Sequence, residues 1–215
     1  VVASYQINTF TVTATAGVGG TITETNVYNC GANVVYDIVV DPCYTISAVT
    51  IDGQSQTIAT SYSFPAIDAD HTIDVQFTIN TYTVNASVNN ATWGSITPAG
   101  NNTYNCDTTI IFNITPNQGA YIDSVVLDGV NLGAIDSFRI AHIDADHTVE
   151  VIFAQYEYTI SSFTNGHVTV APVLGDTTVV YGSNVNYTFT VDDCYAITDV
   201  IVNGDLLFNR PFLAL

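Results

Sequence analysis

The sequence contains no lysine, and its only strong cations are Arg139 and Arg210. Against them stand 20 acidic side chains, so the formal net charge is −18. Such a chain repels nucleic-acid phosphates and anionic bilayers, which excludes nucleic acid and bare membrane surfaces as expected partners. Charged residues make up only 10% of the chain and hydrophobic residues 47%, which indicates a packed globular protein rather than an acidic disordered tail.

The sequence also lacks any apolar run of the roughly 18 residues that a membrane helix needs. No leader with a basic and then an apolar stretch stands before the first expected strand. We therefore expect no membrane insertion in this segment. These absences fit a mature extracellular segment, on a cell surface or in a surface appendage.

Catalytic motifs are missing as well. We find no nucleophile elbow, no phosphate-binding glycine loop and no paired-carboxylate acid–base site, and two of the four histidines belong to a repeated motif. The sequence therefore predicts a protein that is not an enzyme and that has no catalytic residues and no cofactor.

The chain instead carries an internal repeat. The hexapeptide IDADHT occupies residues 67–72 and recurs, 76 residues further on, at residues 143–148. A third copy follows without this motif. Self-similarity at a constant period indicates one structural unit that is copied and stacked. We therefore expect three repeats, at residues 9–80, 81–155 and 156–215, the last of them incomplete.

Each repeat reads as short strands with almost no helical period. Apolar residues alternate with polar ones along them, and we expect one buried face to hold Tyr36 with Ile38, Phe112 with Ile114, and Tyr187 with Phe189. We expect about six strands in each copy. One predicted strand ends in Asp-Gly or Asn-Gly at residues 52–53, 128–129 and 203–204, dipeptides that favour a type I′ hairpin turn. No flexible tether separates one repeat from the next, so the junctions should be stiff. The expected fold is an all-β tandem array that forms a stiff rod.

Residues 1–8 align with residues 73–80, the closing strand of a repeat. Two explanations remain open. The chain is either a segment of a longer array, or these residues act as a donor strand that completes the third repeat of a neighbouring molecule. The second explanation predicts a head-to-tail homopolymer, built by β-augmentation.

The four cysteines form no C-x-x-C pair, which argues against zinc and thioredoxin-like chemistry. Cys30 and Cys43 lie in one repeat and are the candidate disulfide, which would contribute roughly 3 kcal/mol although the segment between them must arch back. Cys106 and Cys194 stand at the corresponding positions of later copies, where they are free or bridge repeats or subunits.

Two further features admit a binding interpretation. The aspartates of IDADHT could hold Ca²⁺, but that ion takes about six to eight oxygens, so we expect these side chains to bond the backbone of their own turn instead. We predict no metal site. Trp93, the only tryptophan, lies in a loop of the second repeat, where it either anchors a partner or covers the junction between repeats.

The motifs occur in a fixed order along nearly the whole chain: FTVTATAG, a glycine-rich hairpin, xxFxITP, VxxDG and DADHTIDVQF. This order resembles the divergent internalin-B-type B-repeat of large bacterial surface proteins. The resemblance implies a secreted β-sandwich or β-grasp-like module of about 75 residues, used as an adhesin stalk or filament body. Its partners would be neighbouring repeats. The alternative function is a carbohydrate-binding module for host or surface glycans, with Trp93 in the binding platform.

Overall fold

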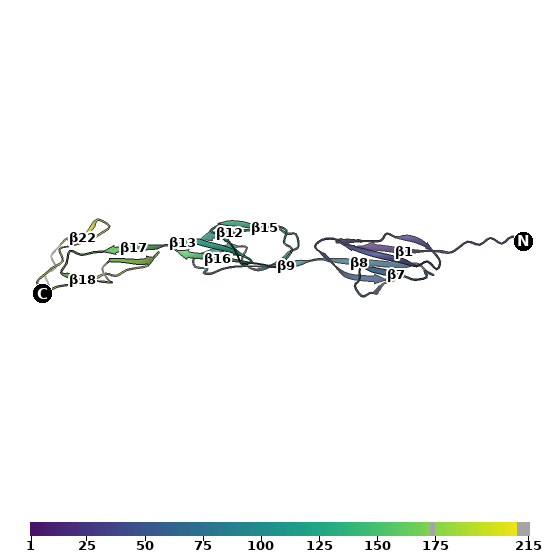
Figure 1. The fold of residues 1–215 in the computed structure, drawn as a ribbon, viewed down its shortest axis with the longest axis horizontal. Coiled ribbons are helices and arrows are strands. Elements are labelled where there is room, and N and C mark those ends of the chain that lie inside the picture. The colour runs from purple at the N-terminus through teal and green to yellow at the C-terminus, as the bar shows by residue number, and fades with distance from the viewer. Residues whose placement is uncertain (173–174, 210–215) are drawn as a thin grey trace.

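The computed structural model describes residues 1–172 and 175–209; Arg210 lies outside them. Within this part the chain is all-β, as predicted, and no helix is long and apolar enough to cross a membrane. Figure 1 shows three groups of strands in succession along the chain. We call these groups the first unit (β1–β8), the second unit (β9–β16) and the third unit (β17–β22).

The first unit consists of two sheets. One is five-stranded, in the order β3-β1-β8-β5-β6, and the other is three-stranded, in the order β2-β4-β7. β1 and β8 run parallel, with Val12 opposite His71, whereas the other neighbours are antiparallel. The strands are β1 (Thr9–Ala16), β2 (Gly20–Ile22), β3 (Asn26–Asn29), β4 (Val34–Val40), β5 (Tyr44–Ile51), β6 (Gln54–Ser55), β7 (Ser61–Phe64) and β8 (His71–Ile79).

The second unit has the same strand order. Its sheets are β11-β9-β16-β13-β14 and β10-β12-β15, and β9 and β16 are again parallel. Each of these two units thus contains eight strands, two more than the alternation predicted, because short edge strands carry too few residues to show it. The strands are β9 (Thr81–Val88), β10 (Gly94–Thr97), β11 (Gly100–Asn105), β12 (Ile110–Pro116), β13 (Ala120–Leu127), β14 (Val130–Gly133), β15 (Ser137–Ile140) and β16 (His147–Gln155).

Apolar residues of the strands build a separate core in each of these units. Tyr36 and Ile38 are buried in the first, Phe112 and Ile114 in the second, and each pair lies on the predicted inward face of its strand. The closing strands β8 and β16 add fully buried residues to these cores, among them Val75 and Val151, each 0% exposed. A parallel closing strand at the centre of the larger sheet therefore completes each core.

The third unit contains three separate strand pairs, β17-β19, β18-β20 and β21-β22. By register these correspond to β9-β11, β10-β12 and β13-β14. Within the described residues no strand lies between β17 and β21, the position that β16 fills in the second unit. The strands are β17 (Glu157–Ser162), β18 (Val168–Ala171), β19 (Gly175–Val180), β20 (Thr188–Val191), β21 (Asp199–Val202) and β22 (Asp205–Asn209).

The predicted hairpin turns are confirmed in all three units. The Asp-Gly and Asn-Gly pairs connect β5 to β6, β13 to β14 and β21 to β22. Both residues of each pair have positive φ, for example 52° at Asp52 and 76° at Gly53. This is the backbone of a type I′ turn, which glycine and short polar residues adopt at low cost.

Candidate functional site

The first unit passes into the second through a single residue, Asn80, which stands between β8 and β9. The Asn80 N–H donates to the carbonyl of Cys43 at 2.8 Å, and the Asn80 carbonyl accepts from the N–H of Cys106 at 2.9 Å. One linking residue is thus held by backbone bonds to a turn of the first unit and to a strand end of the second.

A disulfide between Cys43 and Cys106 reinforces this junction, with the two Cα atoms 5.5 Å apart. The predicted pair, Cys30 with Cys43, is therefore wrong, and Cys30 and Cys194 carry free, exposed thiols. Of the outcomes that the sequence left open for Cys106, a bridge between repeats is the one observed.

Strand geometry explains why Cys30 does not reach Cys43. Cys30 follows β3 and donates its N–H to Asn8, just before β1 begins, whereas Cys43 precedes Tyr44, which pairs with Ile79 at the end of β8. The nine residues of β8 separate these two levels. At about 3.3 Å per residue, the two cysteines lie at opposite ends of the unit.

The second unit passes into the third in the same way. Tyr156 is the linking residue; its N–H donates to the Gly119 carbonyl at 3.0 Å, and its carbonyl accepts from the Tyr181 N–H at 2.9 Å. Gly119 and Tyr181 take the places of Cys43 and Cys106. A Cβ built on Gly119 would overlap the Tyr181 ring, so the aromatic ring packs where the other junction has a disulfide.

Cys43, Gly119 and Cys194 occupy the same position in three equivalent turns. In each turn the next residue along the chain donates its N–H to the carbonyl of the residue that begins the turn. These bonds, at 3.1 to 3.2 Å, run from Tyr44 to Asp41, from Ala120 to Asn117 and from Tyr195 to Asp192. All three have positive φ, 69°, 84° and 69° respectively, as the third residue of a type II turn does. In the first two units this turn therefore places Cys43 or Gly119 against the neighbouring unit.

Replacement of Gly119 by alanine should destabilise the second junction by more than the strain of placing alanine at a positive φ. The matched control is Gly129→Ala, because Gly129 has a similar φ of 81° but open space around the added Cβ. Both variants incur about 1–2 kcal/mol of backbone strain, and only Gly119→Ala also displaces Tyr181. Equal losses in thermal unfolding of the two variants would contradict this contact.

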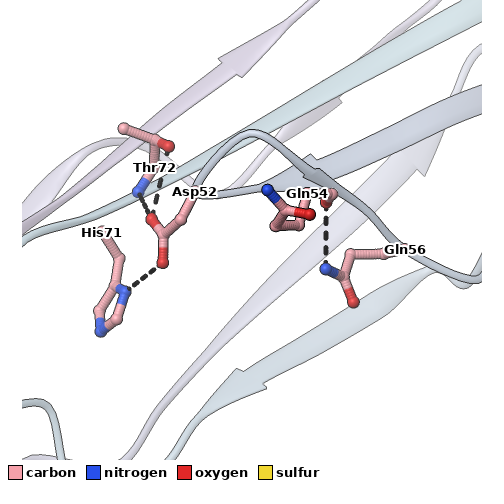
Figure 2. A network of polar contacts seen from close by, with 5 residues as sticks. All are labelled: Asp52, Gln54, Gln56, His71 and Thr72. Atoms are coloured by element: carbon pink, nitrogen blue, oxygen red, sulfur yellow. Dashed lines mark hydrogen bonds and ion pairs between the residues drawn. The ribbon is translucent and has the colours of Figure 1, made fainter.

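The repeated IDADHT motif fastens the start of the closing strand to the hairpin turn, as Figure 2 shows. His71 Nδ1 lies 2.7 Å from Asp52 Oδ2, and the Thr72 N–H donates to Asp52 Oδ1 at 2.8 Å. The second unit repeats both contacts at 2.7 Å, from His147 and Thr148 to Asp128. The motif thus marks where β8 and β16 begin.

The motif's second aspartate spans two strands. Asp70 accepts from the Thr11 N–H in β1, and Asp146 accepts from the Thr83 N–H in β9, both at 2.7 Å. The expected bonds to the motif's own turn are thus replaced, for this aspartate, by a bond across the sheet. Among the described residues no group of three or more His, Cys, Asp or Glu side chains is placed to hold a metal ion.

These bonds couple the motif to pH. The hydrogen bond from His71 lowers the pKa of Asp52 below its ordinary value of 3.8, with a smaller contribution from Thr72. At Asp128 burial raises the pKa, yet the bonds from His147 and Thr148 leave it lowered. A carboxylate whose pKa falls on folding stabilises the fold above its unfolded pKa, and this contribution is lost as pH falls through the folded value.

We therefore expect Asp52→Asn to lower the stability of the first unit by about 1 kcal/mol at neutral pH, since the pair is partly exposed. The difference from the unchanged chain should shrink as pH falls below 3.8. Thermal unfolding between neutral pH and pH 3 measures it, with Asp68→Asn as the control. A difference that persists in acid would contradict the role of the Asp52 charge.

Trp93 lies at the second junction. Its side chain packs on the core of the second unit. Its backbone N–H donates to the Asn90 carbonyl, and its carbonyl accepts from the backbone N–H of Asn117, which begins the turn that contains Gly119. Trp93 also lines an open cleft of about 740 Å³ together with Tyr121, Phe153, Tyr156 and Val180. Of the two roles predicted for Trp93, the structure supports the place at the junction; partner contact stays a prediction.

Sequence reasoning missed the linking residues Asn80 and Tyr156 and the pairing of Cys43 with Cys106. The sequence did contain one signal for this pairing. Cys106 aligns with Cys30, and Cys43 and Cys106 are the two cysteines that flank the junction between the first and second repeats. No family model matches this chain, and no curated protein matches it.

Proposed function

We propose that this chain is a stiff structural segment of an extracellular bacterial surface protein, which acts as an adhesin stalk or filament body. Its repeats stack end to end, and each junction fixes the orientation of the next repeat. The work of such a segment is mechanical, namely to hold an adhesive tip or a neighbouring subunit at a set distance from the cell.

The observation that carries this proposal is the junction between β8 and β9. A single linking residue, two backbone hydrogen bonds and a disulfide connect the two units there. A flexible tether would need several unpaired residues, and Asn80 has both backbone groups bonded. The disulfide further favours an oxidising, extracellular compartment, where such bonds persist.

Small-angle X-ray scattering tests this proposal. A rod of three repeats should have a radius of gyration of about 30 Å, if each repeat is as long as its closing strand, against about 17 Å for a compact globule of 215 residues. The double variant Cys30→Ser, Cys194→Ser keeps the sample free of intermolecular disulfides while leaving Cys43–Cys106 intact. A value near that of a globule would overturn the stalk.

The aromatic cleft at the second junction favours one other function, glycan binding. The rings of Tyr121 and Tyr156 lie 5.2 Å apart between centroids and border the same cleft as Trp93. Sugars stack on such aromatic platforms. Affinity electrophoresis in soluble polysaccharides tests this function. A binding module would be retarded, and Trp93→Ala would abolish the retardation. The control Phe163→Ala, which removes a ring that lies elsewhere and is 90% exposed, would preserve it.

A further inference from the structure

Cys30 stands at one half of a junction. Its N–H donates to the Asn8 carbonyl at 2.8 Å, which is the bond that Cys106 makes with Asn80 at 2.9 Å. Asn8 aligns with Asn80, and Cys30 with Cys106. At the first junction the carbonyl of Cys43 also accepts a hydrogen bond from the N–H of the linking residue Asn80. Within the described residues no turn residue accepts from Asn8 in this way.

Cys194 stands at the other half. Its turn is closed by the same hydrogen bond as that of Cys43, here from Tyr195 to Asp192 at 3.1 Å, and its φ is the same 69°. Within the described part of the chain neither a linking residue nor a strand end meets this turn. The two free thiols therefore occupy complementary positions, Cys194 that of Cys43 and Cys30 that of Cys106.

The third unit has an open strand position beside Cys194. β17 is paired only with β19, and β21 only with β22, among the described residues. Apolar side chains that a closing strand covers elsewhere are exposed here: Phe189 is 41% exposed, whereas Ile38 and Ile114 are 6% and 5% exposed.

Residues 1–8 have the pattern that this position needs. They belong to no strand in the described chain, and Val1, Tyr5 and Ile7 are 132%, 94% and 55% exposed. In alignment with β8, these three residues match the inward-facing Ile73, Phe77 and Ile79, and Ser4 and Gln6 match outward-facing residues. A second copy of this chain offers both this sequence and the complementary thiol of Cys30.

We propose that residues 1–8 of a second copy insert between β17 and β21, and that Cys194 forms a disulfide with Cys30 of that second copy. The inserted strand places Asn8 of the second copy between the two cysteines, as Asn80 lies between Cys43 and Cys106. Repetition of this contact builds a covalent head-to-tail polymer. This inference rests on the proposed structural function and names a second copy of the chain as the partner of the two half-junctions at Cys30 and Cys194.

Formation of the bond removes two electrons and two protons from the two thiols, and a disulfide oxidant accepts them. The Cys194 thiolate attacks the oxidant and expels one thiolate of it, leaving a mixed disulfide. The Cys30 thiolate of the second copy then attacks the Cys194 sulfur of this mixed disulfide and expels the second thiolate. The products are one protein disulfide and two reduced thiols, as with oxidised glutathione.

One contact in the open position differs from those in the first two units. The rings of Phe77 and Phe153 lie directly against Gly20 and Gly94, whereas the corresponding residue of β18 is Val168. Tyr5 of the second copy must therefore pack against a side chain rather than on bare backbone. Because the inserted strand packs less closely than β8 and β16 do, the disulfide should contribute more to the stability of the contact between copies.

Complementary variants test the proposal on the 215-residue chain in a glutathione redox buffer. Cys30→Ser alone and Cys194→Ser alone should each lose the ladder of covalent polymers that the unchanged chain shows on non-reducing gels. A mixture of the two variants should give one dimer that stops there, with a Cys30–Cys194 peptide in its digest. Only glutathione adducts in the mixture, or an undiminished ladder in either single variant, would overturn the proposal.

The strand contact has its own control. Tyr5→Asp should abolish the mixed dimer because it places a charge in the apolar slot, and Gln6→Asp, which changes an outward-facing residue, should preserve it. Equal yields from both would contradict strand insertion. Scattering by the monomeric double variant is independent of these results, so failure of the polymer and failure of the stalk are distinguishable.

Discussion

Replacement of Cys43 by serine is expected to lower the free energy of unfolding of the first two units by about 4 kcal/mol. The Cys43–Cys106 bond closes a loop with a sequence separation of 63, which restricts the unfolded chain. On the chain-entropy relation a loop of that length corresponds to about 4 kcal/mol. This loop contains β8 and β9, so the bond stabilises both units at once.

Guanidinium unfolding measures this loss in the oxidised Cys30→Ser, Cys194→Ser background, where no bond between chains can form at the two free thiols. The same background after reduction is the matched control, because Cys43→Ser should cost almost nothing once the disulfide is already broken. Cys106→Ser should reproduce the effect of Cys43→Ser, and the double variant should add nothing further, since either change breaks the same bond. Additive losses from Cys43→Ser and Cys106→Ser, or an equally large loss in the reduced chain, would contradict the assigned pairing.

Replacement of Phe153 by alanine should lower the free energy of unfolding by about 4 kcal/mol, as is typical for the loss of a large core side chain. Phe153 is 1% exposed, extends from the closing strand β16 and lies against Gly94, so its removal leaves a cavity where the two sheets meet. Denaturant unfolding of the second unit measures this loss.

Ile111→Ala provides the comparison for Phe153→Ala. Ile111 lies in the same unit, on β12, and is 62% exposed. Its loss should stay below about 1 kcal/mol, the range of strand propensity. If Phe153→Ala costs no more than Ile111→Ala, the closing strand does not hold the core, and the open position in the third unit loses its significance.

The strands and turns were largely predictable because they depend on local pattern. Alternation identified Tyr36, Ile38, Phe112 and Ile114 as inward-facing, and all four are buried. The Asp-Gly turns followed from backbone preferences of their own residues. These features need no knowledge of which strands are neighbours.

The cysteine pairing and the exposure of Phe189 were not predictable in this way. Alternation says which face of a strand Phe189 occupies, but not whether another strand covers that face. Proximity in sequence suggested Cys30 with Cys43, whereas the parallel closing strand carries the chain to the far end of the unit before the next one begins. Both outcomes depend on where a closing strand lies, which is set by contacts between residues far apart in sequence, such as Val12 with His71.

Residual dipolar couplings of the oxidised Cys30→Ser, Cys194→Ser chain measure most directly whether a junction fixes the orientation of successive units. They are recorded separately for backbone N–H groups of the first unit and of the second unit in a weakly aligned sample. A stiff junction at Asn80 predicts one common alignment tensor for both units in the chain that has Cys43–Cys106. Two tensors of different magnitude and orientation would show independent motion and would contradict the stalk.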